Sequence, residues 1–205
     1  DAGAGVGADA GPEILVIDGE DTFTAMLAHV LRSSGSAVSV VRYDQPGLRE
    51  LALSHDGPVV LGPGPGDPRD ADDPKMRFLR RLTADLVREH RDGLLGVCLG
   101  HELLAAELGL ELVRKEVPYQ GAQEVIDFFG RPETVGFYST FTARADDAVA
   151  VELAAHRVEL SRDASSGEVH ALRGPGFAGV QFHPESVLTL NGAVVVRELL
   201  AGVLV

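Results

Sequence analysis

The only cysteine of the chain lies in a setting that suits a nucleophile. Cys98 is the centre of the sequence Gly-Val-Cys-Leu-Gly, residues 96–100. The apolar run Leu94–Val97 predicts a strand before it, and helical spacing of leucine and alanine predicts a helix over Glu102–Leu110. Small neighbours let the backbone turn sharply and present the thiol, as in a nucleophile elbow, and a helix N-terminus would favour the thiolate. Because the pattern is short, a buried cysteine that only packs as a small apolar side chain is the alternative.

A histidine and a glutamate follow a second predicted strand, Gly179–Phe182. If both strands are parallel in one sheet, His183 and Cys98 open onto the same crevice at the carboxyl ends. Glu185 can turn back to the imidazole and fix its tautomer, which would complete a Cys–His–Glu triad. The other six histidines lack this context, and His101 in the helix after the cysteine is not expected to be the base.

A stiff loop follows a third predicted strand, Pro58–Leu61. Its sequence, residues 62–68, is Gly-Pro-Gly-Pro-Gly-Asp-Pro. Alternating proline and glycine exclude regular structure but leave backbone N–H groups exposed. The loop lacks the Lys-Ser/Thr ending of a P-loop and the spacing of a dinucleotide fingerprint. We expect it to offer N–H donors to an oxyanion or a substrate carbonyl; a rigid surface turn is the alternative.

The remaining pattern predicts the elements that position these segments. The predicted strands are residues 13–18, 37–42, 58–61, 94–97 and 179–182, and the predicted helices are residues 22–31, 47–54, 73–90, 102–110 and 191–204. Their alternation predicts an α/β fold with an open, mainly parallel sheet flanked by helices. Short β-like segments at 125–129, 133–141, 149–153, 156–161 and 169–172 predict an added antiparallel β portion.

Residues 1–12 are rich in glycine and alanine and predict a flexible linker or tail, with a frayed terminus as the alternative; residues 13–205 are expected to form the domain.

The net charge of −13 argues against non-specific binding to nucleic acid or to an anionic membrane. A single cysteine excludes an intrachain disulfide framework and a multi-cysteine metal site. No apolar run or signal sequence predicts a membrane segment, so we expect a cytoplasmic protein without a metal site of its own.

Three motifs together resemble those of class I, or triad-type, glutamine amidotransferases. They are Gly-Val-Cys-Leu-Gly-His at 96–101, Gly-Pro-Gly-Asp-Pro at 64–68 and Val-Gln-Phe-His-Pro-Glu-Ser at 180–186, in the family's order and spacing across about residues 13–205. The resemblance implies a flavodoxin-like open sheet. It also implies that Cys98 attacks the side-chain carboxamide of L-glutamine to form a γ-glutamyl thioester. His183, oriented by Glu185, would protonate the departing ammonia and then activate water.

The resemblance also implies the contacts of the substrate. The oxyanion hole would consist of the backbone N–H groups of Leu99, Gly64 and Gly66. The substrate-binding residues would be Gly64, Pro65, Gly66, Glu102, Thr140 and Phe141. Glu102 departs from the family, which commonly has glutamine here. A carboxylate cannot donate a hydrogen bond, although it can accept one from the substrate's ammonium, so an altered affinity for glutamine is expected.

The segments at 117–123, 126–130 and 135–138 resemble glutaminase parts fused to chorismate-using synthases of phenazine and enediyne biosynthesis, which make 2-amino-2-deoxyisochorismate. Fused anthranilate synthases are similar. This implies a chorismate-binding synthase partner, separate or fused upstream as a domain, that holds Mg²⁺ and receives the ammonia by an internal route. No cofactor is expected in this chain. The alternatives are a γ-glutamyl hydrolase or cysteine peptidase relative, and a catalytically silent regulatory or scaffold protein of the synthase, for which Glu102 is the one favourable feature.

Overall fold

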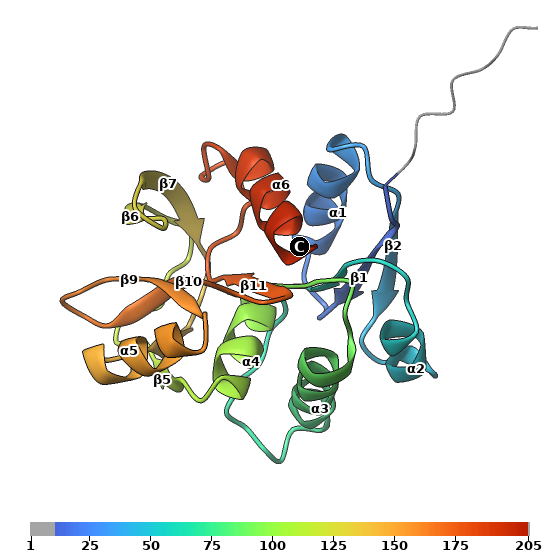
Figure 1. Ribbon diagram of the computed structural model, residues 1–205, viewed down its shortest axis with the longest axis horizontal. Coiled ribbons are helices and arrows are strands. Elements are labelled where there is room, and N and C mark those ends of the chain that lie inside the picture. The colour runs from blue at the N-terminus through green and yellow to red at the C-terminus, as the bar shows by residue number, and fades with distance from the viewer. Residues whose placement is uncertain (1–10, 205) are drawn as a thin grey trace, which may run out of the picture.

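A sheet of nine strands separates two groups of helices in the computed structural model, which describes residues 11–204 (Figure 1). The strands of this sheet are β1 Ile14–Asp18, β2 Val38–Arg42, β3 Val59–Leu61, β4 Leu94–Val97, β5 Glu111–Arg114, β8 Phe141–Arg144, β9 Glu159–Arg162, β10 Glu168–Gly174 and β11 Phe177–Val180. A separate antiparallel pair consists of β6 Ala122–Asp127 and β7 Pro132–Phe137. The helices are α1 Thr24–Ser33, α2 Leu48–Leu53, α3 Pro74–Glu89, α4 Leu99–Glu107, α5 Asp147–Ala155 and α6 Gly192–Val203.

The strand order is β2-β1-β3-β4-β11-β10-β8-β5, with β9 paired to β10. The five strands from β2 to β11 are parallel, and the pairs beyond β11 are antiparallel. The predicted α/β fold with an open, mainly parallel sheet and an added antiparallel portion is therefore confirmed.

Alternating side chains of β1 explain why both faces of the sheet are covered. Ile14 and Val16 belong to the core that includes residues of α1 and α6, whereas Leu15 and Ile17 belong to the core with α2, α3 and α4. Successive residues of a strand point to opposite faces, so a continuously apolar strand needs helices on both sides. Figure 1 shows α1 and α6 above the sheet and α2, α3 and α4 below it.

The parallel pairing brings the chemically interesting segments to one edge of the sheet. Leu61 at the end of β3 pairs with Gly96 of β4, and Val97 pairs with Val180 of β11. The loop after β3, the cysteine after β4 and the histidine segment after β11 consequently leave the sheet side by side. This is the carboxyl edge, where open α/β sheets bind ligands.

Some predicted elements were wrong. Residues 149–153, predicted as a short β-like segment, lie in α5. The carboxylate of Asp146 accepts a hydrogen bond from the N–H of Val149 and caps this helix, and a cap of this kind outweighs weak strand propensity. Helix α4 begins at Leu99, directly after the cysteine and not at Glu102. Strand β5 was not predicted, and β11 ends at Val180, two residues before the predicted end.

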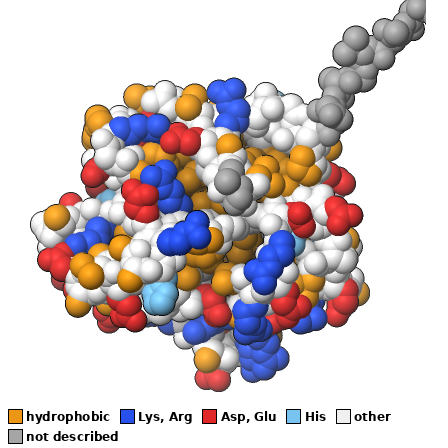
Figure 2. Space-filling model, in the orientation of Figure 1, with side chains coloured by type: hydrophobic (Ala, Val, Ile, Leu, Met, Phe, Trp, Pro, Cys, Tyr) orange, Lys and Arg blue, Asp and Glu red, His pale blue; other side chains and the backbone are white. Residues whose placement is uncertain are grey.

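The four arginines of α3 are exposed, whereas Lys75 in its first turn is half-buried. Figure 2 shows Lys and Arg side chains gathered below the centre of the view, where Figure 1 places this helix.

Within residues 11–204, none of the helices combines the length and the apolar character that crossing a membrane requires. The predicted linker over residues 1–12 lies outside the described residues except for its last two positions.

Candidate active site

Cys98 occupies a sharp turn between β4 and α4. Its backbone angles are φ 52° and ψ −103°, and positive φ is uncommon for a residue with a side chain. A Cβ on Gly100 would lie 2.1 Å from the carbonyl oxygen of Leu61, and one on Gly96 would lie 2.6 Å from the backbone of Gly100. The strand and the helix approach so closely that only glycine fits at these two positions. This is the geometry that the sequence predicted for an elbow.

The thiol of Cys98 is buried and is held next to the neighbouring strand. Its backbone N–H donates to the carbonyl oxygen of Val180 at 2.9 Å, and its Sγ accepts a hydrogen bond from Nε2 of Gln181 at 3.8 Å. Burial raises the pKa of the thiol well above its ordinary value, and the negative charges of Glu102, Asp21 and Glu185 raise it further. The N–H of Leu99 lowers it, but this contribution is the smallest. The expected preference for thiolate is therefore wrong for this structure, and ionisation needs a proton acceptor.

His183 and Glu185 form a buried pair after β11. The imidazole Nδ1 and the carboxylate Oε1 are 2.6 Å apart, and the side chains are 1% and 0% exposed. The carbonyl oxygen of His183 accepts from Thr189 Oγ1 at 2.7 Å, which fixes the turn. Because Glu185 engages Nδ1, the remaining ring nitrogen is Nε2, which is buried and has no hydrogen-bond partner in the described part of the chain. The structure thus places an oriented imidazole and a thiol after adjacent parallel strands.

Two aromatic side chains enclose this imidazole, and the sequence interpretation missed both. The ring centroids of Phe23 and Tyr138 lie 4.8 Å and 5.2 Å from that of His183, and 4.7 Å from each other. The hydroxyl group of Tyr138 is hydrogen-bonded to Ser186 Oγ at 3.0 Å. These contacts restrict the ring and limit access of water to it. No local motif marks Phe23, which lies 160 residues earlier in the chain.

Glu102 lies on the first turns of α4 and is buried. Its Oε1 accepts from Nε2 of Gln181 at 2.9 Å, so Gln181 bridges the carboxylate and the sulfur of Cys98. Burial raises the pKa of Glu102 to about 7, the hydrogen bond from Gln181 opposes this, and the charge of Asp67 adds to it. The sequence interpretation did not single out Gln181, although it stands two residues before the histidine. Its role in joining the segment after β11 to the first turns of α4 is visible only after folding.

The loop at residues 62–68 lies against the loop that follows β1. A Cβ on Gly64 would lie 2.3 Å from the carbonyl oxygen of Gly19, so the two backbones are in direct contact. Asp67 is paired with Arg69 at 2.8 Å, and this interaction lowers the pKa of the carboxyl group. The guanidinium of Arg69 stands 4.9 Å above the ring of Phe141. The loop is thereby connected to the predicted substrate segment, in which Thr140 is half-buried and Phe141 is buried.

His101 does not belong to this arrangement. Its Nε2 donates to the carbonyl oxygen of Val169 at 3.1 Å, and burial lowers its pKa to about 4. A neutral imidazole bonded to the sheet agrees with the expectation that it is not the base. Among residues 11–204, no group of three or more His, Cys, Asp or Glu side chains is arranged to hold a metal ion.

The structure therefore combines an open α/β sheet with a cysteine elbow and a His–Glu pair at its carboxyl edge, an arrangement whose groups can carry out nucleophilic thiol chemistry. The family model for class I glutamine amidotransferases matches residues 15–202. A phenazine-specific anthranilate synthase of Pseudomonas fluorescens is 44% identical over 196 residues, which cover 95% of this chain and 30% of that protein. An anthranilate synthase component 2 of Archaeoglobus fulgidus is 33% identical over 90% of this chain and 94% of its own length.

A solved structure from Thermoplasma acidophilum, named for a component of GMP synthase, aligns with a TM-score of 0.71 at 21% identity. The alignment covers 93% of this chain and 92% of that one, and it supports the fold. The chain belongs to the class I glutamine amidotransferase family. It spans less than a third of the length of the Pseudomonas fluorescens relative.

Proposed function

We propose that this chain is a glutaminase domain that hydrolyses L-glutamine and delivers the ammonia to a chorismate-aminating synthase partner or fused domain. The single observation that carries the proposal is the arrangement of Cys98 and the His183–Glu185 pair after adjacent parallel strands. Family membership supports it.

The proposed chemistry begins with transfer of the thiol proton from Cys98 to Nε2 of His183. A base is required because burial disfavours the thiolate. The sulfur then attacks the carboxamide carbon of glutamine, and a tetrahedral oxyanion forms. The imidazolium donates its proton to the departing nitrogen, ammonia leaves and a γ-glutamyl thioester remains. His183 next takes a proton from water, hydroxide attacks the thioester carbon, and the proton returns to sulfur as glutamate is released. Glu185 holds the ring in the tautomer that exposes Nε2 and stabilises the imidazolium.

The oxyanion is proposed to accept hydrogen bonds from the N–H groups of Leu99, Gly64 and Gly66. Each preorganised donor of this kind contributes about 3–4 kcal/mol to transition-state stabilisation. The remainder of glutamine is proposed to contact Pro65, Glu102, Thr140 and Phe141. Glu102 would accept a hydrogen bond from the substrate's ammonium group.

The partner and product are proposed from relatives. The Pseudomonas fluorescens protein is named as a phenazine-specific anthranilate synthase. The region of that protein that is similar to this chain makes up 30% of its length. We infer a chorismate-binding partner that holds Mg²⁺ and makes either 2-amino-2-deoxyisochorismate or anthranilate, whereas this chain needs no cofactor. A lone reactive thiol suits the reducing cytoplasm, where we place the reaction.

The test is glutamine hydrolysis by this chain together with its synthase partner, in the wild type and in Cys98→Ala. We expect glutamate formation with an aminated chorismate product in the wild type. We expect neither with glutamine in the variant, while added ammonium still supports product. The mass of the product distinguishes anthranilate from aminodeoxyisochorismate. Glutamate formation that survives Cys98→Ala would refute the proposed nucleophile, and its absence from the wild-type complex would favour a silent scaffold.

A further inference from the structure

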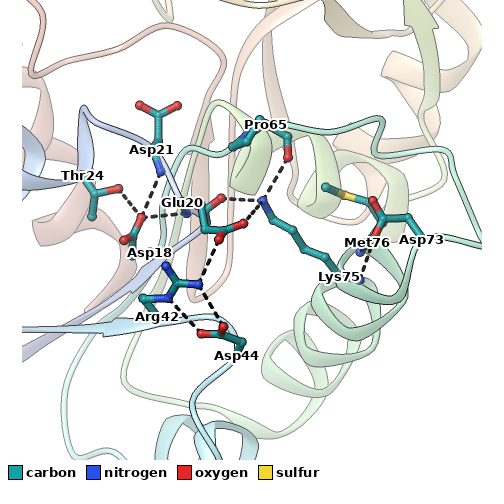
Figure 3. Close-up of polar contacts among 11 residues, drawn as sticks. Asp18, Glu20, Asp21, Thr24, Arg42, Asp44, Pro65, Asp73, Lys75 and Met76 are labelled. Atoms are coloured by element: carbon teal, nitrogen blue, oxygen red, sulfur yellow. Dashed lines mark hydrogen bonds and ion pairs between the residues drawn. The ribbon is translucent and has the colours of Figure 1, made fainter.

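Lys75 is a half-buried cation at a position where a helix does not favour one. It lies in the first turn of α3, and positive charge at a helix N-terminus is unfavourable. Its ammonium nevertheless has a full set of acceptors. Nζ donates to the carbonyl oxygen of Gly19 at 2.6 Å and to that of Pro65 at 3.1 Å, and it lies 3.5 Å from a carboxylate oxygen of Glu20 (Figure 3). The lysine therefore ties α3 to both loops at the carboxyl edge of the sheet.

The contact with Pro65 determines how the next N–H group is presented. The carbonyl of Pro65 and the N–H of Gly66 belong to one peptide unit, and the described part of the chain has no cis peptide bond. In a trans peptide these two groups point in opposite directions. A carbonyl directed to Lys75 therefore directs the N–H of Gly66 away from it. This N–H has no acceptor among the described residues, so it is available to a ligand.

Because Gly66 has no side chain, the Pro65–Gly66 peptide plane can rotate by about 180° at little cost unless a contact selects one orientation. Gly66 has φ +129°, in a region that glycine enters without the usual steric penalty. The methyl group of Met76 packs against its Cα, since a Cβ there would lie 2.3 Å from Cε. The carboxylate of Asp73 accepts hydrogen bonds from the N–H groups of Lys75 and Met76 at 2.8 Å and 3.4 Å (Figure 3). The first turn of α3 is thus fixed and contacts the Pro65–Gly66 peptide with two successive side chains.

We propose that Lys75 is a positioning residue that holds the Pro65–Gly66 peptide with the N–H of Gly66 presented to the oxyanion. The inference rests on the proposed glutaminase function, because it assigns the origin of one oxyanion donor. Lys75 itself does not touch the substrate. Its contribution is to the transition state, in which the oxyanion forms, and much less to the binding of glutamine.

The test compares Lys75→Met, which keeps an unbranched apolar stem, with Glu20→Gln. The control removes the charged partner of the same ammonium and leaves both carbonyl contacts in place. In this chain with its synthase partner, we expect Lys75→Met to lower kcat for glutamine hydrolysis roughly 10- to 100-fold, part of the loss seen when an oxyanion donor is deleted. We expect KM to change by less than about threefold, since uniform binding is retained. The rate at which iodoacetamide alkylates Cys98 should stay within about twofold, because alkylation forms no oxyanion.

A kcat for Lys75→Met within about twofold of the wild type would overturn the inference. A decrease of kcat in Glu20→Gln as large as that in Lys75→Met would overturn it too. A parallel loss of Cys98 alkylation would overturn it as well, because it would indicate general damage to the elbow. A crystal structure of Lys75→Met tests the orientation independently of activity. We expect the Pro65–Gly66 peptide to be reversed or present in two orientations, and a single unchanged orientation would refute the inference. Failure of the wild type to hydrolyse glutamine would instead refute the proposed function.

Discussion

Replacing Glu102 by glutamine tests the electrostatics of the site by a change of very few atoms. Glu102 is 4% exposed, and its hydrogen bond from Gln181 can be accepted equally by the amide oxygen of a glutamine. The variant Glu102→Gln therefore keeps the shape and one hydrogen bond, but it removes the charge.

The expected change in unfolding free energy follows from the pKa of Glu102. Burial raises the pKa of Glu102 from an ordinary 4.5 to about 7 in the folded protein. The stability that this group contributes is complete below pH 4.5 and is lost as the pH rises through 7, because the folded state disfavours the ionised form. Each pKa unit corresponds to about 1.4 kcal/mol, so the full loss is about 3 kcal/mol. Glutamine does not titrate, and Glu102→Gln should gain about 2–3 kcal/mol in unfolding free energy relative to the wild type between pH 5 and pH 8.

Urea denaturation of both proteins at pH 5, 6, 7 and 8 measures this difference. The matched control is Glu107→Gln, which makes the same change of atoms on the exposed face of the same helix, away from the site. Because the charge of Glu102 also raises the pKa of Cys98, iodoacetamide should alkylate Cys98 faster in Glu102→Gln at pH 8. A difference between Glu102→Gln and the wild type that stays constant across this range would refute the reasoning.

Two further substitutions test the elbow and the base. Gly100→Ala should lower the unfolding free energy by about 1–3 kcal/mol, since the new methyl group would lie 2.1 Å from the carbonyl oxygen of Leu61; Gly202→Ala, with open space around it, should be neutral or stabilising. Equal stabilities of these two variants by urea denaturation would contradict the packing argument. Glu185→Gln should lower kcat for glutamine hydrolysis roughly 100-fold or more at saturating glutamine, because His183 loses the charge that stabilises its protonated form. An unchanged kcat would show that this carboxylate has no part in catalysis.

Local patterns were sufficient for the parallel half of the fold. The apolar runs at 14–17, 59–61 and 94–97 are buried strands in the structure, because a strand covered on both faces must be apolar throughout. The prediction of a strand at 149–153 was wrong because the alternating valines there are typical of a strand, and the hydrogen bond by which Asp146 caps α5 was not considered. The antiparallel portion was predicted less completely: β5 was missed, since it has no buried residue and carries charged residues at both ends.

The sequence by itself determined the elements of the site that depend on neighbouring residues. Cys98 between two glycines needs a tight turn, and Glu185 two residues after His183 can reach its imidazole through a short segment of chain. These are short-range steric and hydrogen-bonding constraints, so they can be predicted from the order of the residues.

Only the tertiary structure decided what surrounds these groups. Phe23 against His183, Gln181 between Glu102 and Cys98, and Lys75 on the carbonyl of Pro65 are joined by strand pairing or by helix packing. The same burial reversed the expectation of a thiolate, because desolvation of the sulfur outweighs the N–H of Leu99 at the helix N-terminus. Desolvation depends on every group that packs around an atom, and the immediate sequence neighbours of that atom do not reveal it.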